Sequence, residues 1–289
     1  MKLLRIGAPG AERPVLLEIA NDGHERYLNL SDIAEDIDGP FLASGGLDRV
    51  RAALAEGSLP ELTPPAGGWR LGAPVARPGK VVCIGLNYRD HAEETGAAIP
   101  QRPVVFMKDP GTVVGPYDAV LIPRGSVKAD WEVELAVVIG RRARYLDSSE
   151  EALACVAGYA ISNDVSEREF QLEFSSQWDL GKSCETFNPL GPWLVTPDEV
   201  GDPQDLGLRL SVDGVPRQNG HTKNMIFDVA EIVRYLSQYL VLEPGDVVNT
   251  GTPAGVALGL PDQPYLRPGQ TVELGIDRLG TQRQLFTDA

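Results

Sequence analysis

The chain has 289 residues and a formal net charge of −15, and 43% of its residues are hydrophobic. This composition allows a sizeable buried core and argues against disorder, while the absence of a basic cluster argues against nucleic-acid binding. No apolar run approaches the ~20 residues that cross a bilayer, and the three cysteines form no Cys-x-x-Cys pair. We therefore expect a cytoplasmic protein with reduced thiols that binds neither nucleic acid nor membrane.

The first 70 residues differ in pattern from the rest of the chain. Residues 3–6 and 14–19 are predicted as short strands around a Gly/Pro turn, and residues 47–56 as a helix. The Pro/Gly-rich segment 60–68 favours neither helix nor strand. We therefore predict a small α+β domain over residues 1–70 and a larger domain over residues 71–289.

The larger domain is predicted to be rich in short strands. Strands are expected at residues 80–86 and 131–139, and a capping box at 148–151 predicts a helix that leads to a third strand ending near Asp164. A further helix begins at residues 227–228, and two turn signals, at 243–246 and 267–270, each precede a strand. These elements indicate a strand-dominated α+β fold, with a mixed sheet rolled around a central cleft.

Two glutamates alternate with apolar residues in the segment 131–139. Alternate side chains of a strand share a face, so Glu132 and Glu134 are expected about 7 Å apart at Cα. Such carboxylates repel each other unless a proton or a cation joins them, and a hard divalent cation suits oxygen ligands. The alternative is a solvent-facing strand edge with two ordinary glutamates.

Asp164 follows a nearly continuous apolar and small segment, residues 156–162. The end of a buried strand is a common place for a functional site. The alternative is a helix N-cap, because Glu167 follows three positions later. Together with the two glutamates, Asp164 would form an open Mg²⁺ or Mn²⁺ site with room for water and substrate.

A short helix with a histidine–carboxylate pair is predicted after the strand at 80–86. Asn87 can cap it and Gly96 can end it, and His91 and Glu94 at i, i+3 share one face. The carboxylate can fix the tautomer of the imidazole, which makes a base able to activate water. The alternative is an exposed, charge-rich helix.

Two further segments are candidates for substrate contact. Lys182 stands among small and apolar residues, where it could stabilise an enolate or a substrate carboxylate; the alternative is a surface lysine. The segment 250–256, Thr-Gly-Thr-Pro-Ala-Gly-Val, allows close approach of backbone to a ligand; the alternative is a plain turn.

In their order along the chain, these segments resemble the fumarylacetoacetate hydrolase family. The matching pieces are Gly85-Leu86-Asn87-Tyr88 with His91 and Glu94, Trp131-Glu132-Val133-Glu134-Leu135, Asp164, Gly181-Lys182-Ser183, Asn188-Pro189-Leu190-Gly191-Pro192 and Thr250-Gly251-Thr252-Pro253-Ala254-Gly255-Val256. Each piece is weak by itself, and their number and order carry the resemblance. It extends from about residue 72 to the C-terminus.

The resemblance implies a mixed β-sandwich roll that forms a homodimer. It implies Mg²⁺ or Mn²⁺, with Ca²⁺ as an alternative, held by Glu132, Glu134 and Asp164. It also implies that residues 88–96 form a lid that brings His91 and Glu94 over the metal as catalytic residues. By the same resemblance, Lys182 is a catalytic or substrate-binding cation, and Tyr88 and Thr252 bind substrate, Thr252 at its carboxylate.

Within the family, residues 181–187 and 237–239 resemble the 2,4-diketo-3-deoxy-L-fuconate and rhamnonate hydrolases, which are often labelled ureidoglycolate lyases. The chain departs from relatives that act on small acylpyruvates, because those often have Arg in place of Leu86 and Lys-Pro-Ser in place of residues 108–110. Both departures concern the expected substrate pocket.

The resemblance implies hydrolysis of the C3–C4 bond of a small anionic 2,4-diketo acid, either an acylpyruvate or a diketo-deoxy sugar acid. The products would be pyruvate and a second carboxylic acid. Alternatives on the same site are oxaloacetate decarboxylation and isomerisation or hydration of a keto acid. A more remote alternative is a non-catalytic sugar-acid-binding protein.

Overall fold

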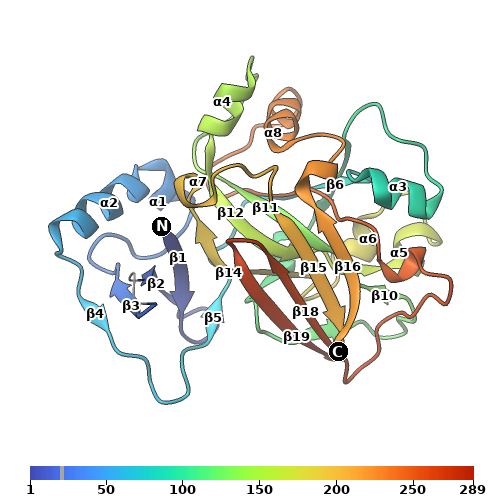
Figure 1. Cartoon of the computed structure of the whole chain (residues 1–289), viewed down its shortest axis with the longest axis horizontal. Helices are drawn as coiled ribbons and strands as arrows, with labels where there is room; N and C mark the ends of the chain where they lie inside the picture. Colours follow the sequence, from blue (N-terminus) through green and yellow to red (C-terminus); the bar gives the residue numbers. More distant parts are fainter. Residues whose placement is uncertain (20–22) are drawn as a thin grey trace.

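A twelve-stranded mixed sheet is the framework of the computed structural model, which describes residues 1–19 and 23–289 (Figure 1). Ten strands follow one another in the order β4 (Glu61–Leu62), β3 (Glu25–Asn29), β2 (Arg13–Ile19), β1 (Lys2–Ile6), β14 (Asn188–Val195), β12 (Val156–Asn163), β11 (Val133–Ile139), β17 (Val247–Asn249), β6 (Val81–Gly85) and β7 (Val104–Lys108). Two short strands pair off this path, β5 (Leu71–Gly72) with β1 and β8 (Val113–Val114) with β14. Most neighbours are antiparallel, whereas β17 and β6 are parallel.

A five-stranded sheet lies against this framework, in front of β11 and β12 in Figure 1. Its strands, in order, are β16 (Val215–His221), β15 (Gly207–Val212), β18 (Thr271–Ile276), β19 (Gly280–Asp288) and β9 (Val120–Ile122). The main hydrophobic core fills the space between the two sheets: Val133 and Leu135 of β11 belong to the same buried cluster as Leu210 of β15 and Leu274 of β18. A two-stranded sheet of β10 (Ala129–Asp130) and β13 (Ser166–Glu167) closes one end.

The helices are short and lie around the sheets (Figure 1). They are α1 (Gly39–Ala43), α2 (Gly46–Glu56), α3 (Arg89–Thr95), α4 (Ser149–Ala154), α5 (Arg168–Leu172), α6 (Asp179–Lys182), α7 (Pro197–Val200) and α8 (Val229–Ser237), with 3-10 turns η1 (Pro110–Thr112), η2 (Thr222–Asn224) and η3 (Ala257–Gly259). As predicted, Ser148 caps α4 by accepting the N–H of Glu151, and Asp228 accepts the N–H of Glu231 at the start of α8. The described residues contain no helix long and apolar enough to cross a membrane.

The N-terminal strands extend the large sheet, because β1 pairs antiparallel with β14 through Lys2↔Val195 and Leu3↔Leu194. The two strands and the helix predicted in this region are confirmed as β1, β2 and α2. The division of the chain at residue 70 stays a prediction.

The predicted strand-dominated α+β class is confirmed, with one difference at the strand that carries the two glutamates. β11 begins at Val133, so Trp131 and Glu132 precede it. At this point side chains take the place of a neighbouring strand as hydrogen-bond acceptors. The side chain of Asn163 accepts the backbone N–H of Glu132, and that of Gln218 accepts the backbone N–H of Val133. Both faces of β11 are buried, as is typical of a central strand that is covered by packed layers.

Candidate active site

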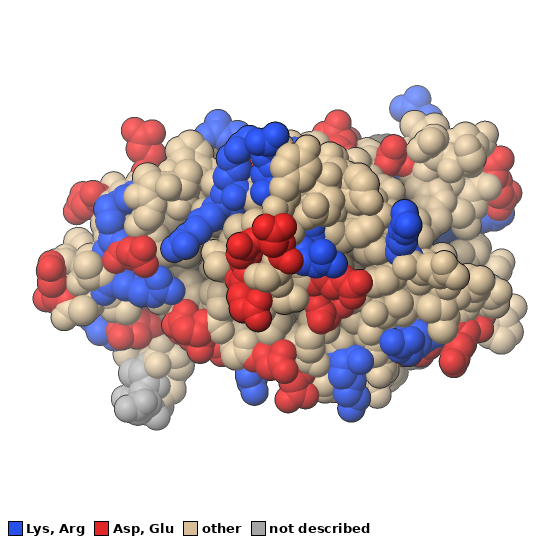
Figure 2. All heavy atoms as spheres, turned by 90° about the horizontal axis from the view of Figure 1, so that it is seen from above, with Lys and Arg blue, Asp and Glu red and all other residues tan. Residues whose placement is uncertain are grey.

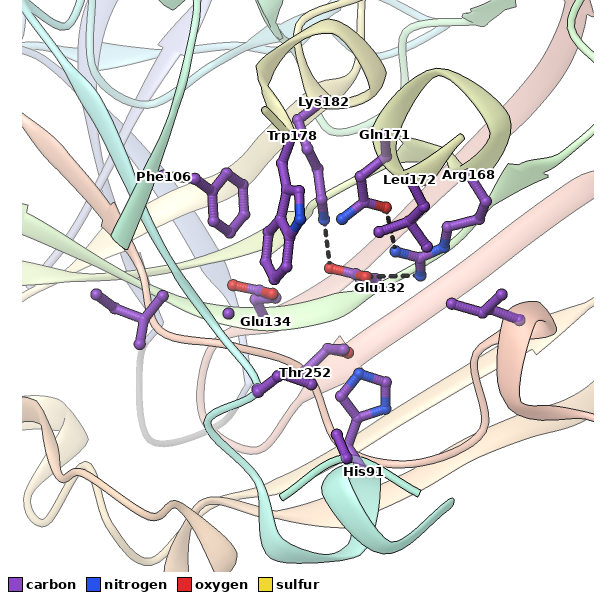
Figure 3. A pocket seen from close by; sticks show the side chains of 15 residues that line it. His91, Phe106, Glu132, Glu134, Arg168, Gln171, Leu172, Trp178, Lys182 and Thr252 are labelled. Carbon is purple, nitrogen blue, oxygen red and sulfur yellow. Dashed lines mark hydrogen bonds and ion pairs between the residues drawn. The ribbon is translucent and has the colours of Figure 1, made fainter. Parts of the chain in front are cut away.

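A cavity of about 210 Å³ lies between α3 on one side and α5 and α6 on the other (Figure 3). Its lining combines charged and apolar side chains from segments that are far apart in the sequence. The lining residues are Ile84, Gly85, Leu86, His91, Ala97, Phe106, Glu132, Glu134, Arg168, Gln171, Leu172, Trp178, Lys182, Thr252 and Leu258. Enclosed pockets with a few convergent polar groups are the usual sites of small ligands.

The three predicted metal ligands meet in this part of the molecule. One carboxylate oxygen from each of Glu132, Glu134 and Asp164 lies within 4.8 Å of the others. The pairing of β11 with β12 brings them together, because Val133 is opposite Asn163 and the N–H of Asp164 donates to the carbonyl of Glu132 at 2.9 Å. Asp164 follows β12 directly, Glu132 directly precedes β11, and Glu134 is the second residue of β11.

The burial of these carboxylates excludes the two alternatives raised by the sequence. Glu132 and Glu134 are 5% and 2% exposed, so they do not form a solvent-facing edge. Asp164 is fully buried and does not cap a helix, because Glu167 caps α5 by accepting the N–H of Phe170. Three buried carboxylates at this spacing repel one another and require compensating positive charge.

Two buried lysines supply part of that charge. Lys182 Nζ donates to Glu132 Oε2 at 2.8 Å and to Asp164 Oδ2 at 3.0 Å. Lys108 Nζ donates to Asp164 Oδ1 and to the carbonyls of Val165 and Phe187. The surface-lysine alternative for Lys182 is wrong, because this residue is 2% exposed.

Arg168 supplies a third buried cation from α5. Its Nη2 donates to Glu132 Oε1 at 2.7 Å, its Nε to Asp130 Oδ2 at 2.8 Å and its Nη1 to Gln171 Oε1 at 2.9 Å. Asp130 in turn accepts the N–H groups of Ala257 and Leu258 at the start of η3. Arg168 and Asp130 thereby connect Glu132 to η3 and to Leu258, which also lines the cavity.

The two glutamates have opposite electrostatic environments. Burial alone would raise the pKa of Glu132, but Lys182 and Arg168 outweigh this effect and lower its pKa well below the usual range. Burial, together with the charges of Asp164 and Glu132, raises the pKa of Glu134 well above its usual value. Among the described residues, no Lys or Arg forms an ion pair with Glu134, which accepts the backbone N–H of Gly251 at 2.8 Å.

A divalent cation fits this donor set. It would meet three buried carboxylates and would supply the positive charge that Glu134 lacks. Carboxylate oxygens are the ligands that Mg²⁺, Mn²⁺ and Ca²⁺ favour.

The predicted histidine pair lies across the cavity from Glu132 (Figure 3). His91 belongs to α3 and is 8% exposed, and its Nδ1 lies 3.5 Å from Glu94 Oε2. Both oxygens of Glu94 accept the backbone N–H of Gly255, at 2.9 and 3.1 Å. The carboxylate is thereby held beside the imidazole, so the exposed-helix alternative is wrong for this face of α3.

Asn87 does not cap α3, contrary to the prediction. Tyr88 stands at the N-cap position, without a side-chain hydrogen bond, and Gly96 ends the helix with φ of 66° as predicted. The Asn87 side chain instead donates to the carbonyls of Phe227 and Thr250 and accepts the N–H of Phe227. It therefore joins the segment that precedes α3 to two distant loops.

The two predicted substrate-binding residues have different positions. Thr252 lines the cavity, and its hydroxyl donates to the carbonyl of Val133 at 2.9 Å and accepts from Gln218 Nε2 at 2.8 Å. Tyr88 is fully buried in the main core and is not among the lining residues. Burial, and then the charge of Glu134, raise the pKa of Tyr88 well above its usual value. Its role in substrate binding stays a prediction.

Sequence reasoning missed the roles of Arg168, Lys108 and Asp130. One signal was present for Lys108, because it ends the apolar run Val104–Met107 and a charge there must find a buried partner. No comparable local signal marked Arg168, whose segment reads as an ordinary charged helix start. Its partners lie 36 and 38 positions away in the chain.

The chain is similar to known proteins over nearly all of its length. Residues 80–287 match the family model described as fumarylacetoacetate (FAA) hydrolase C-terminal. A protein of Burkholderia multivorans (strain ATCC 17616 / 249), whose name marks it only as a presumed hydrolase, is 52% identical over 99% of this chain and 98% of its own length. A solved fumarylacetoacetate hydrolase from Exiguobacterium antarcticum is 34% identical with a TM-score of 0.84 and covers all of both chains. A 2-hydroxyhepta-2,4-diene-1,7-dioate isomerase from Mycobacterium marinum is also 34% identical, with a TM-score of 0.75, over 100% of this chain and 98% of its own.

Proposed function

The chain belongs to the fumarylacetoacetate hydrolase family, and we propose that it is a metal-dependent hydrolase that cleaves the C3–C4 bond of a 2,4-diketo acid. The products are pyruvate and a second carboxylic acid. The observation that carries the proposal is the placement of the His91–Glu94 pair opposite the buried carboxylates in one cavity. A base facing a cation site is the arrangement needed to direct water at a bound carbonyl.

We propose that Glu132, Glu134 and Asp164 hold Mg²⁺ or Mn²⁺, with Ca²⁺ as an alternative. When bound, the cation would supply positive charge that orients the carboxylate and 2-keto oxygen of the substrate and stabilises the enolate that leaves. The remaining chemistry falls to side chains of this chain.

His91 removes a proton from the attacking water in this mechanism. The oxygen adds to the C4 carbonyl, the C3–C4 bond breaks, and its electron pair stays on C3 as the enolate of pyruvate. Glu94 holds the imidazole through Nδ1 and supports its protonated form. The protonated His91 then returns a proton, at C3 of the enolate or through water, so the balance of the reaction is one water consumed.

Lys182 places an ammonium beside the carboxylates, where the negative charge of the enolate develops. Burial alone would lower its pKa, but the charges of Asp164 and Glu132 outweigh this effect and raise it, so Lys182 stays protonated throughout. It therefore acts as a fixed positive charge, and the acid–base step falls to His91.

Pyruvate release tests the proposal directly. The purified protein with Mg²⁺ is expected to release pyruvate from at least one of a panel of 2,4-diketo acids, at a rate that EDTA abolishes. A panel that includes acylpyruvates and 2,4-diketo-3-deoxy sugar acids and yields no pyruvate would contradict it.

Isomerisation of an unsaturated keto acid is a second candidate, favoured by the similarity to the dioate isomerase. It needs proton transfer between carbons and no attack by water. A shift of the substrate's ultraviolet absorbance without pyruvate release would favour it. Oxaloacetate decarboxylation gives the same pyruvate enolate without water attack, so oxaloacetate belongs in the same panel.

The predicted homodimer and the predicted cytoplasmic location stay proposals. Light scattering of the purified protein would test the dimer, and fractionation of cells would test the location.

A further inference from the structure

The lining of the cavity combines a few charged side chains with a larger number of apolar ones. Lys182 and Arg168 pair with Glu132, and apolar side chains begin directly beside them: Trp178 lies next to Lys182, and Leu172 next to Arg168 (Figure 3). Lys182 Nζ is 5.1 Å from the centroid of the Phe106 ring. The apolar set is Ile84, Leu86, Ala97, Phe106, Leu172, Trp178 and Leu258. A ligand whose reacting end is at the carboxylates must place the rest of its chain against these side chains.

The cationic side chains of the lining are already engaged. Lys182 Nζ has three acceptors, which are Glu132 Oε2 and the Oδ2 and backbone carbonyl of Asp164. Each of the three guanidinium nitrogens of Arg168 donates to Asp130, Glu132 or Gln171. Neither side chain can turn to pair with a second carboxylate on a ligand without leaving a buried carboxylate of the protein unpaired, which is costly.

One part of the apolar lining depends on close packing between a side chain and a glycine of the backbone. The indole of Trp178 lies directly on Gly85, where a Cβ atom would stand 2.4 Å from Trp178 Cζ3. The indole also packs against the ring of Phe106, edge to face at a centroid distance of 5.3 Å. Glycine at position 85 allows the indole to pack this closely, because any larger residue would place a Cβ atom too close to the ring.

We propose that this enzyme selects 2,4-diketo acids whose acyl group is apolar, alkyl or aryl, over those that end in a second carboxylate or carry several hydroxyls. This inference rests on the proposed function for the position of the reacting end. A second carboxylate would lie against leucine and tryptophan side chains, and Lys182 and Arg168 are already paired with carboxylates of the protein. A sugar chain would lose its hydrogen bonds to water in the same place.

Matched substrates test the preference. Butanoylpyruvate and succinylpyruvate have the same number of carbons and differ in a terminal methyl or carboxylate. The kcat/KM for pyruvate release is expected to be at least about 100-fold higher for the butanoyl compound, and to rise about fourfold for each methylene from acetyl to butanoyl. Equal or better turnover of succinylpyruvate, or of a 2,4-diketo-3-deoxy sugar acid, would overturn the inference.

A binding measurement separates this inference from the proposed reaction. Calorimetry with Mg²⁺ present compares 2-oxohexanoate with 2-oxoadipate, which again differ only in a methyl or carboxylate end. Tighter binding of 2-oxohexanoate is expected whether or not any diketo acid is cleaved. If no pyruvate forms but this order holds, the proposed reaction fails and the apolar preference stands; if 2-oxoadipate binds equally or more tightly, the preference fails.

A charge placed in the wall should reverse the order. Leu172→Arg is expected to lower kcat/KM for butanoylpyruvate and raise it for succinylpyruvate, mainly through KM. Leu180→Arg is the matched control, because Leu180 is 62% exposed and is not among the lining residues. If both variants show the same substrate order as the parent enzyme at unchanged melting temperature, the wall does not determine specificity.

Discussion

The carboxylate of Glu94 accepts the backbone N–H of Gly255 through both of its oxygens, at 2.9 and 3.1 Å. This contact fastens α3 to the loop that also carries Thr252. A Cβ atom on Gly259 would stand 2.4 Å from Glu94 Cδ, so the carboxylate is enclosed on that side as well. Glu94 therefore holds both the imidazole of His91 and the helix that carries it.

Replacement of Glu94 should lower turnover without unfolding the protein. In Glu94→Ala, kcat is expected to fall roughly 100-fold, because a misplaced base loses the aligned geometry for attack. Glu93→Ala is the control, since Glu93 is exposed on the same helix. Steady-state kinetics and the melting temperature check this, and parent-like kcat in Glu94→Ala would show that the contact has no catalytic importance.

Removal of the proposed base should separate catalysis from metal binding. His91→Ala is expected to lose about 10²–10⁴-fold in kcat, while its affinity for Mn²⁺, measured by electron paramagnetic resonance, stays that of the parent. Wild-type turnover in this variant would exclude His91 as the base.

Glu134→Gln should weaken metal binding and leave the metal-free protein at least as stable as the parent. The amide oxygen can still accept the Gly251 N–H, while the repulsion from Asp164 and Glu132 is removed. Metal at 100 times its Kd should stabilise the parent by about 2.7 kcal/mol and the variant by much less. Thermal unfolding with and without Mn²⁺ measures both effects, and equal metal-induced stabilisation would show that Glu134 is not a ligand.

Breaking the Lys108–Asp164 pair should be strongly destabilising. Both side chains are fully buried, so Lys108→Met is expected to cost about 3–5 kcal/mol in the metal-free protein, because Asp164 loses one of its two cations. Lys128→Met removes a lysine from the more exposed pair with Glu173 and should change little. Urea unfolding compares the two, and a small effect at Lys108 would mean that the site relaxes around an unpaired Asp164.

Stability should fall in alkaline solution. Burial, and to a smaller extent the charge of Asp202, raise the pKa of Tyr159 well above its usual value of 10.0. The neutral phenol is therefore favoured in the folded state, and its contribution is complete below about pH 10 and is lost as pH rises through the folded-state pKa. Above about pH 10, the free energy of unfolding should decline less steeply with pH in Tyr159→Phe than in the parent. The difference in slope corresponds to at most one proton released on unfolding. Tyr145→Phe, at a 59% exposed position, serves as control, and parallel curves for the parent and Tyr159→Phe would refute the assignment.

The periodicity of the sequence was enough to predict which side chains of the site point the same way. The alternation in residues 131–139 placed Glu132 and Glu134 together, and the i, i+3 spacing placed His91 beside Glu94. Both relationships involve neighbours in one segment, so the geometry of one strand or one helix is enough to predict them.

Only the tertiary structure decided what surrounds these groups. The register of β11 on β12 put Asp164 beside Glu132, and packing brought Lys108 and Arg168 to carboxylates 56 and 36 positions away. Tertiary packing also directs the Asn87 side chain to Phe227 instead of the helix end, and it places Trp178 against Gly85. Such pairings depend on which distant segments pack against each other. A buried charge must have a partner and a core must be filled, and no local pattern in the sequence encodes which segments meet these requirements.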